Sequence, residues 1–479
     1  MKVAINPKTK TDTLHISMHN DILNALQSKP RITSRKFKTQ LRIFVMGAAY
    51  AISSKRMLSS PFVQRTVKMP DMFMNLGHQV FHLGHEESKV NCTEHISVTN
   101  TEIIKKCYGE DYDMTEPPPN AVADDSAFQH FHKEAERELR KRIQPDDIVL
   151  SLFGWADKPL IDRIQDLPCH IIEASIGYPD SAFQNRVFQS PCKFNFERGR
   201  SSATLHMRAD FPDSEPAKKF RTWERLTENE PDTQSTVIPP MTDPRDIEYS
   251  ENKKDYMILV GRINRCKGLD IAIKLAEYTD TKLIIAGMRD KHKHLKNLSD
   301  REYLEYVAAV KVPDNVEFIG TADLKTRSTL YRDARVAVFM SRFLEPGHNT
   351  HIEANMAGTP IIVPNHGITM DYVMQGVNGF LCHPDDFSDV VDAYESIDQI
   401  KPSDCRDYAM NFSLDRISLM YHNWFHKVIQ NSHRDFWEVI PKDNRIDKDW
   451  LRFPEYPYPH EKVKQKIVEI RQKIASEAS

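Results

Sequence analysis

Two glutamates, Glu345 and Glu353, lie eight positions apart in the segment 341–360, which reads SRFLEPGHNTHIEANMAGTP. Glu345 precedes a predicted helix, and Glu353 lies inside it. The segment follows an apolar strand, and α/β proteins bind ligands at the carboxyl ends of such strands. Carboxylates accept hydrogen bonds, so both side chains suit sugar hydroxyls. The spacing alone also fits an ordinary loop with two solvated glutamates, and both interpretations stay open on this ground.

The start of the same helix offers a second kind of chemistry, because the first backbone N–H groups of a helix have no partner within it. These groups bind anions, and the helix dipole adds to the attraction. Gly347, His348, Asn349 and Thr350 occupy this place in the sequence. We therefore expect a phosphate at the amides and a sugar at the carboxylates.

A basic loop, GRINRCKG from Gly261 to Gly268, joins a predicted strand to a predicted helix. Arg262 offers a forked guanidinium and Lys267 a point charge, a combination that suits a diphosphate. Basic residues in such loops are also commonly solvated. No GxxxxGK[ST] motif occurs, and no GxGxxG motif follows a strand, so the sequence does not favour nicotinamide or flavin binding.

Metal and disulfide chemistry find no support in the sequence. The seven cysteines are scattered without a CxxC pair, and the twenty histidines form no HExxH motif. We therefore expect no metal site and no cofactor, a reducing compartment and a cytoplasmic location.

The composition excludes two broad classes of protein. The 479 residues carry 65 Lys and Arg against 68 Asp and Glu, a net charge of −3, which argues against a polycationic nucleic-acid binder. No apolar run reaches the roughly 18–20 residues that span a bilayer. Residues 1–40 hold eight Lys or Arg and two Asp or Glu. We interpret them as a flexible basic arm, with contact to a lipid surface or a polyanion as the alternative.

Strands and helices alternate along the rest of the chain. A strand at 41–46, a helix at 62–75 and a strand at 80–83 form a βαβ unit, which predicts a parallel sheet. The same alternation starts again at 256–260 after a polar linker. We predict an α/β protein with four parts: the arm at 1–40, a Rossmann-like domain at 41–245, a second such domain at 246–430 and an extension with an amphipathic helix at 431–479.

The motifs of the second domain, taken in order, resemble a known family. GRINRCKG, LIIAG, VEFIG, LYRDARVAVFMSRFLEPGHNTHIEANMAGTPIIV and GVNGFL resemble the donor domain of glycosyltransferase family 4 over about residues 255–430. The resemblance implies a GT-B fold, in which two Rossmann-like domains face each other across a cleft. It also implies retaining, metal-independent transfer of a sugar from a nucleotide sugar, such as a UDP- or GDP-sugar, to an acceptor.

The resemblance also implies roles for single residues. Arg262 and Lys267 would hold the diphosphate, Glu345 would lie near the donor sugar, and we expect these three to be catalytic. Glu353 would contact the ribose hydroxyls. The remaining donor-binding positions implied are Gly261, Gly347, His348, Asn349 and Thr350.

The first domain matches the family less well. Its first loop reads GAAY from Gly47 in place of a double glycine, and the segment EASIGYP begins at Glu173. We expect both to lie on the acceptor side, although a structural carboxylate fits Glu173 equally. The family's Pro-Phe-Gly is replaced by Pro-Gly-His at 346–348. The acceptor (glycan, lipid, protein or other) is not identified. The alternatives are a nucleotide-sugar epimerase, a phosphorylase and a non-catalytic nucleotide-sugar-binding protein.

Overall fold

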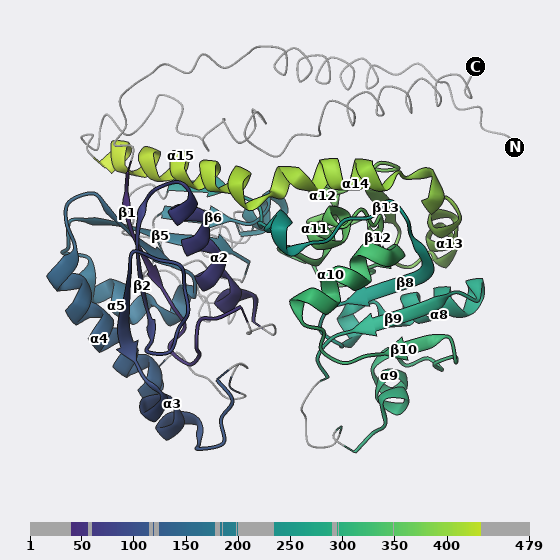
Figure 1. Ribbon diagram of the computed structural model, residues 1–479, viewed down its shortest axis with the longest axis horizontal. Coiled ribbons are helices and arrows are strands. Elements are labelled where there is room, and N and C mark those ends of the chain that lie inside the picture. Colours follow the sequence, from purple (N-terminus) through teal and green to yellow (C-terminus); the bar gives the residue numbers. More distant parts are fainter. Residues whose placement is uncertain are drawn as a thin grey trace, which may run out of the picture.

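The computed structural model describes residues 40–55, 60–114, 118, 124–177, 183, 185–197, 199, 234–289, 295, 297–347 and 349–432 (Figure 1). These residues form two α/β units with a parallel sheet in each. The predicted arm at 1–40 lies outside the described residues except for Gln40. The predicted extension at 431–479 is described only at its first two positions.

The first sheet has the strand order β3-β2-β1-β4-β5-β6-β7, and all neighbouring strands are parallel. Its strands are β1 (Arg42–Met46), β2 (Gln79–His85), β3 (Glu94–Thr99), β4 (Asp147–Ser151), β5 (Cys169–Ile176), β6 (Asn185–Phe188) and β7 (Gln234–Val237). The helices of this unit are α2 (Pro61–Asn75), α3 (Thr101–Tyr108), α4 (Ser126–Arg142) and α5 (Lys158–Ile164).

The second sheet has the order β10-β9-β8-β11-β12-β13, again with parallel neighbours. Its strands are β8 (Lys254–Val260), β9 (Lys282–Ala286), β10 (Val316–Phe318), β11 (Ala334–Val338), β12 (Ile361–Pro364) and β13 (Gly379–Cys382). The helices are α8 (Leu269–Thr279), α9 (Asp300–Ala308), α10 (Leu324–Asp333), α11 (Asn349–Met356), α12 (Thr369–Tyr372), α13 (Phe387–Glu395) and α14 (Pro402–Ala409).

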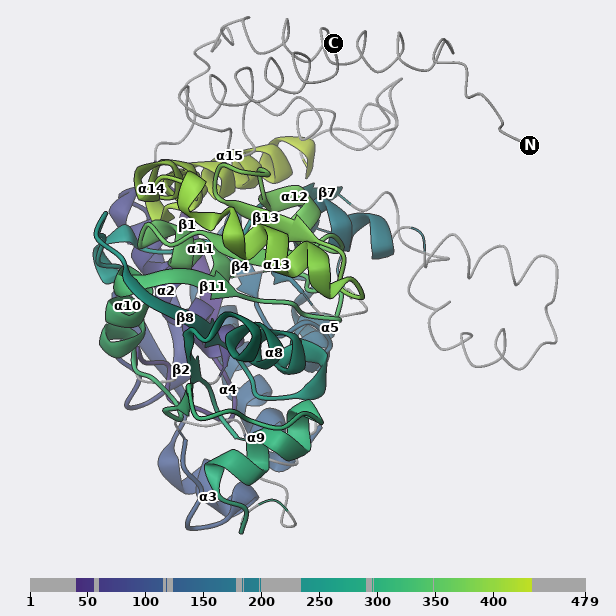
Figure 2. The same cartoon turned by 90° about the vertical axis from the view of Figure 1, so that its right-hand side faces the viewer.

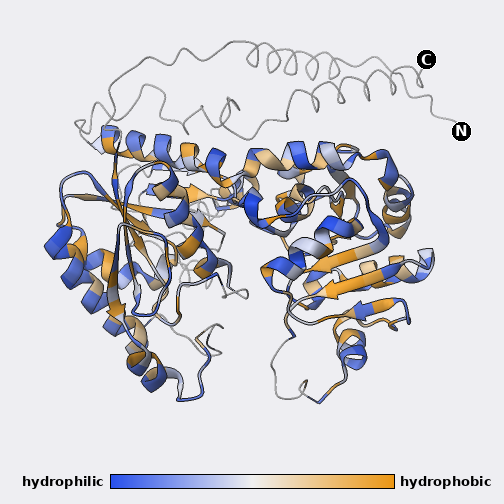
Figure 3. Ribbon diagram, viewed as in Figure 1, coloured by the Kyte–Doolittle hydropathy of each residue, from blue (hydrophilic) through white to orange (hydrophobic). Residues whose placement is uncertain are grey.

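Alternate residues of the central strands pack on opposite faces of each sheet, because side chains alternate along a strand. In β8, Met257 and Leu259 belong to the core that includes α8, whereas Ile258 belongs to the core that includes α11. Both faces are therefore covered, as Figure 3 shows by the apolar strands inside and the polar outer faces of the helices. This arrangement confirms the predicted doubly wound α/β class.

The long helix α15 (Leu414–Ser432) crosses back from the second domain onto the first. Its apolar stripe packs in the core beneath β1 and α2, where the Phe73 ring lies 5.4 Å from that of Phe425 and 6.0 Å from that of Tyr421. Figures 1 and 2 show α14 and α15 along one edge of the molecule. We predicted this helix as part of the second domain, 246–430. Its apolar stripe shows that one face is buried but does not show which domain covers that face.

None of the helices in the described part of the chain is long and apolar enough to cross a bilayer.

Candidate active site

The two loops singled out in the sequence meet at the point where the second sheet reverses its strand order. β8 and β11 are parallel neighbours, with Met257 opposite Val336, so both loops leave the same sheet edge. The N–H of Arg342 and the hydroxyl of Ser341 donate to the carbonyl of Cys266 at 2.7 and 3.1 Å. Open α/β sheets bind ligands at this kind of reversal.

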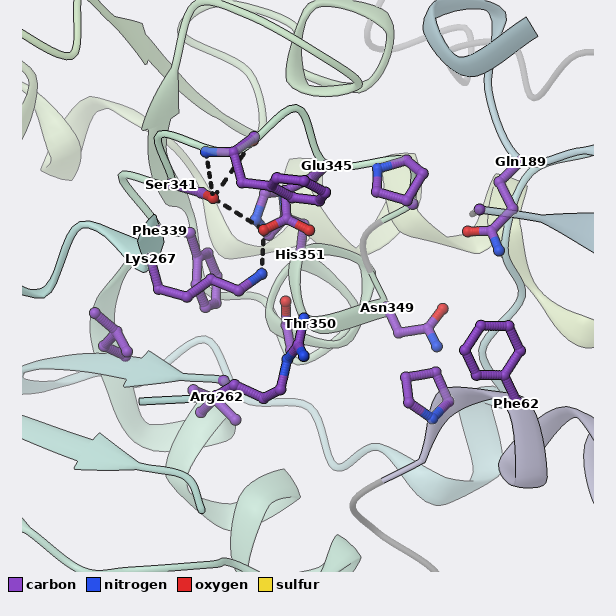
Figure 4. A pocket seen from close by; sticks show the side chains of 18 of the residues that line it. Phe62, Gln189, Arg262, Lys267, Phe339, Ser341, Glu345, Asn349, Thr350 and His351 are labelled. Carbon is purple, nitrogen blue, oxygen red and sulfur yellow. Dashed lines mark hydrogen bonds and ion pairs between the residues drawn. The ribbon is translucent and has the colours of Figure 1, made fainter. Parts of the chain in front are cut away.

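The loops also line a cavity of about 440 Å³ between the two domains (Figure 4). A cavity of this size is in the range of small-molecule sites. The second domain contributes, among others, Gly261, Arg262, Lys267, Glu345, Gly347, Asn349, Thr350 and His351. The first domain contributes Pro61, Phe62, Arg65, Gly177 and Gln189.

Lys267 and Glu345 are paired with each other. The Lys267 ammonium donates to Glu345 Oε1, which also accepts the Ser341 hydroxyl at 2.9 Å. Figure 4 shows this chain of contacts on one side of the cavity. Glu345 therefore holds the ammonium in place, a contact between residues 78 positions apart that the sequence does not reveal.

Arg262 is the exposed cation of the cavity wall. No described acidic residue forms an ion pair with it. A guanidinium without an acidic partner can take a phosphate without first breaking an ion pair, and its forked donors fit two phosphate oxygens.

His351 lies in the wall beside Lys267, and sequence analysis did not single it out. It is buried, and its ring stacks on Phe339 with centroids 4.6 Å apart. Burial, with the Lys267 charge as a smaller cause, holds the pKa of His351 well below its ordinary value. The imidazole is thus neutral at pH 7. His348, the histidine proposed from the sequence, lies outside the described residues.

Glu353, predicted to contact the ribose, forms a buried ion pair with Arg327, and its ribose contact stays a prediction. Its carboxylate is 2% exposed and accepts two hydrogen bonds from Arg327, at 2.8 Å from Nε and 3.2 Å from Nη2. It is not among the described residues that line the cavity. A buried carboxylate requires a charged partner, and the guanidinium from α10 supplies one.

The two residues expected on the acceptor side also lie away from the cavity wall. Gly47 donates its N–H to the Leu83 carbonyl at 2.7 Å, and a Cβ at position 47 would lie 2.7 Å from that oxygen. Its role is close packing between β1 and β2. Glu173 is fully buried in β5, opposite Ser151 in the sheet register. Other first-domain residues line the cavity, and the acceptor-side roles of Gly47 and Glu173 stay predictions.

Sequence analysis missed the first-domain wall. Ser60 caps α2 by accepting the Val63 N–H at 3.4 Å, and Phe62 and Arg65 follow on the first turns of that helix. Gly177 belongs to the EASIGYP segment, which we selected from the sequence because of Glu173. The segment reaches the cavity through Gly177 and not through Glu173. Gln189 follows a short polar strand that gave no signal.

Metal-binding residues do not cluster in the described chain: no group of three or more His, Cys, Asp or Glu residues there is arranged to hold an ion. All seven cysteines lie in described segments, and each is a free thiol.

Residues 242–411 match the family of glycosyl transferases group 1. The match covers about a third of the chain, within the second domain. It contains both the basic loop and the two glutamates, so the loops of the cavity belong to the matched region.

Similarity to curated proteins covers parts of each. An uncharacterized glycosyltransferase of Methanocaldococcus jannaschii is 32% identical over 144 residues, which are 29% of this chain and 34% of that protein. Spore coat protein SA of Bacillus subtilis is 26% identical over 189 residues, 36% of this chain and 48% of that protein. The chain therefore spans a third to a half of the length of these relatives.

Solved structures match over both domains. AviGT4, a glycosyltransferase involved in avilamycin A biosynthesis, aligns with a TM-score of 0.55 and 16% identity over 81% of this chain and 98% of its own. Sucrose-phosphate synthase from Thermosynechococcus elongatus aligns with a TM-score of 0.55 and 15% identity over 81% and 99%. The predicted GT-B fold, with two Rossmann-like domains, is confirmed.

Proposed function

We propose that this protein is a glycosyltransferase that moves a sugar from a nucleotide-diphosphate sugar to an acceptor. The observation that supports this most directly is the convergence of Arg262, Lys267 and the start of α11 on one cavity between the two domains. Two cations and a helix N-terminus together suit a diphosphate. The match of residues 242–411 to group 1 glycosyltransferases supports the same donor class.

The charges of the site favour departure of a diphosphate. When the bond from sugar to phosphate breaks, the leaving oxygen gains negative charge. Fixed positive charge at Arg262 and Lys267 therefore stabilises the transition state more than the ground state. In this proposal Glu345 positions the Lys267 ammonium, and Arg262 meets the phosphates directly.

We extend the proposal to transfer with retention of configuration. Glu345 is the carboxylate among the described residues that line the cavity, and it is paired with Lys267 and Ser341. Because this carboxylate is already hydrogen-bonded to Lys267 and Ser341, the acceptor hydroxyl would give its proton to an oxygen of the leaving phosphate instead. That oxygen lies on the same face of the sugar as the acceptor. Attack from that face retains the anomeric configuration. The acceptor would approach from the first domain.

The experiment that tests the function is a screen of UDP-, GDP- and ADP-sugars with the purified protein. We expect one donor to bind and to be hydrolysed slowly without an acceptor, with release of the nucleoside diphosphate. NMR of the released sugar at early times gives the configuration. Failure to bind any of these donors or their nucleoside diphosphates would contradict the proposal.

The same assay tests whether a metal ion takes part. In this proposal Arg262 and Lys267 neutralise the diphosphate without a divalent ion, so we expect turnover with the donor found to stay within about twofold after EDTA treatment and desalting. Loss of activity restored by Mg²⁺ or Mn²⁺ would show that the reaction needs a metal.

A further inference from the structure

A buried amide side chain of the first domain, Gln189, faces the second domain across the cavity. It directly follows β6 and is 2% exposed. Its Nε2 donates to the carbonyl of Ser175 at 2.6 Å. No described residue donates a hydrogen bond to its Oε1. Because Gln189 lines the cavity, this oxygen is available to accept a hydrogen bond from a ligand hydroxyl.

The orientation of this amide is fixed by its neighbours. The Ser175 carbonyl accepts from both Gln189 Nε2 and Arg65 Nη1, the latter at 2.9 Å. Ser175 itself has a φ of 59°, which turns the chain at the end of β5. Because Nε2 is held at Ser175, Oε1 points the other way, toward the loop of the second domain.

Two glycines make room for the amide, one from each domain. A Cβ at Gly347 would lie 1.8 Å from Gln189 Oε1, and a Cβ at Gly177 would lie 2.9 Å from Gln189 Nε2. Any side chain at position 347 would therefore displace the amide oxygen from the donor loop. The oxygen reaches this loop only because residue 347 is a glycine.

The cavity has two chemically different ends. Figure 4 shows Arg262 and Lys267 on one side, and Gln189, Asn349 and Phe62 on the other. A diphosphate fits the cationic side. A sugar fits the other side, because amides bind hydroxyls.

We propose that Gln189 Oε1 accepts a hydrogen bond from a hydroxyl of the transferred sugar, so that a first-domain residue takes part in the choice of donor sugar. The inference rests on the proposed function. It differs from the expected roles of Glu345 and Glu353, since it assigns sugar recognition to the opposite domain.

The test compares binding of the nucleotide sugar with binding of its nucleoside diphosphate, measured by calorimetry. Gln189→Met keeps the length of the side chain and removes both polar atoms. We expect the Kd for the nucleotide sugar to rise about five- to tenfold, and the Kd for the nucleoside diphosphate to stay within twofold. The matched control is Gln165→Ala, at an exposed glutamine of the same domain, which should change neither value.

Deoxy analogues of the donor identify the contact. Wild type should bind one monodeoxy nucleotide sugar more weakly than the full sugar, whereas Gln189→Met should bind the two equally. Gln189→Leu, which removes the same oxygen, should reproduce this pattern and serves if Gln189→Met does not fold. Equal losses for the nucleotide sugar and the diphosphate, or no loss at all, would overturn the proposal. If wild type binds no nucleotide, the proposed function fails instead.

Discussion

Arg262 and Arg265 lie in the same loop and are both exposed, but only Arg262 lines the described cavity. We expect Arg262→Ala to weaken binding of the nucleoside diphosphate about tenfold or more, from the loss of a charge-assisted contact of about 1.5–3 kcal/mol. Arg265→Ala is the matched control, because it removes the same charge from the same loop. Calorimetric Kd values for both variants check this. Equal rises in Kd for the two variants would indicate that Arg262 attracts the diphosphate at long range and does not contact it.

Lys267 and Glu345 form one unit, so their substitutions should not be additive. Lys267→Met leaves an unpaired carboxylate facing the phosphates and should weaken diphosphate binding more than the double variant Lys267→Met/Glu345→Gln does. Glu345→Gln alone should lower kcat at least tenfold, about 1.4 kcal/mol, because it removes the charge that positions the ammonium. Additive effects on Kd would show that the two residues act independently.

At the scale of elements, the loop after β8 depends on one glycine. Gly268 has a φ of 69°, and a Cβ there would lie 1.9 Å from the carbonyl oxygen of Met340. Gly320 has nearly the same φ, 70°, with open space around it. Gly268→Ala should therefore lower the Tm more than Gly320→Ala and should also weaken diphosphate binding. Gly320→Ala should show only the cost of strain, about 1 kcal/mol. Thermal unfolding and calorimetry of the two variants check these expectations. Similar losses of Tm would show that a Cβ at position 268 does not collide with the Met340 carbonyl.

Local patterns predicted most of the elements that position the site. The apolar runs at 41–46 and 256–260 predicted strands that the structure shows as β1 and β8, and the strand-to-helix turn after β11 predicted α11. The segments that became β3 and β6 gave no such signal, because each has only two or three buried residues among polar ones.

Contacts between distant residues could not be predicted. The partner of Glu345 is 78 positions away, and the partner of Glu353 is Arg327 on another helix. Spacing shows which side chains share a face and does not show which partner meets that face. For this reason the sequence located the loops of the candidate site and did not find its first-domain wall.

At the scale of the whole molecule, α15 docks on the first domain partly through histidines. His422 Nδ1 lies 3.1 Å from His78 Nε2, and the His422 and His426 rings are 4.4 Å apart. Burial, followed by the charge of the neighbouring imidazole, lowers the pKa of His78 and of His426 to about 4. All three rings are therefore neutral at pH 7 in the folded protein.

This cluster predicts acid sensitivity of the α15 contact. The ordinary histidine pKa is 6.5, so as the pH falls below this value the unfolded chain takes up protons before the folded one. The stabilisation of the folded protein by these neutral histidines is complete above pH 6.5 and is lost as the pH falls toward 4. His78→Asn keeps an acceptor for the Leu41 N–H and should reduce the fall in Tm between pH 7 and pH 5. His130→Asn, on α4, is the control; an unchanged pH profile in His78→Asn would contradict the expectation.

The return of α15 makes the chain pass between the domains twice, and the two passages lie side by side. The Thr242 N–H donates to the Phe412 carbonyl, and the Leu414 N–H donates to the Thr242 carbonyl, both at 3.0 Å. These adjacent passages, which pair at Thr242 and Ser413, form one joint between the domains. A rotation of the domains about this joint would open and close the cavity, and Gln189 and Gly347 would return to the same contact each time the cavity closes.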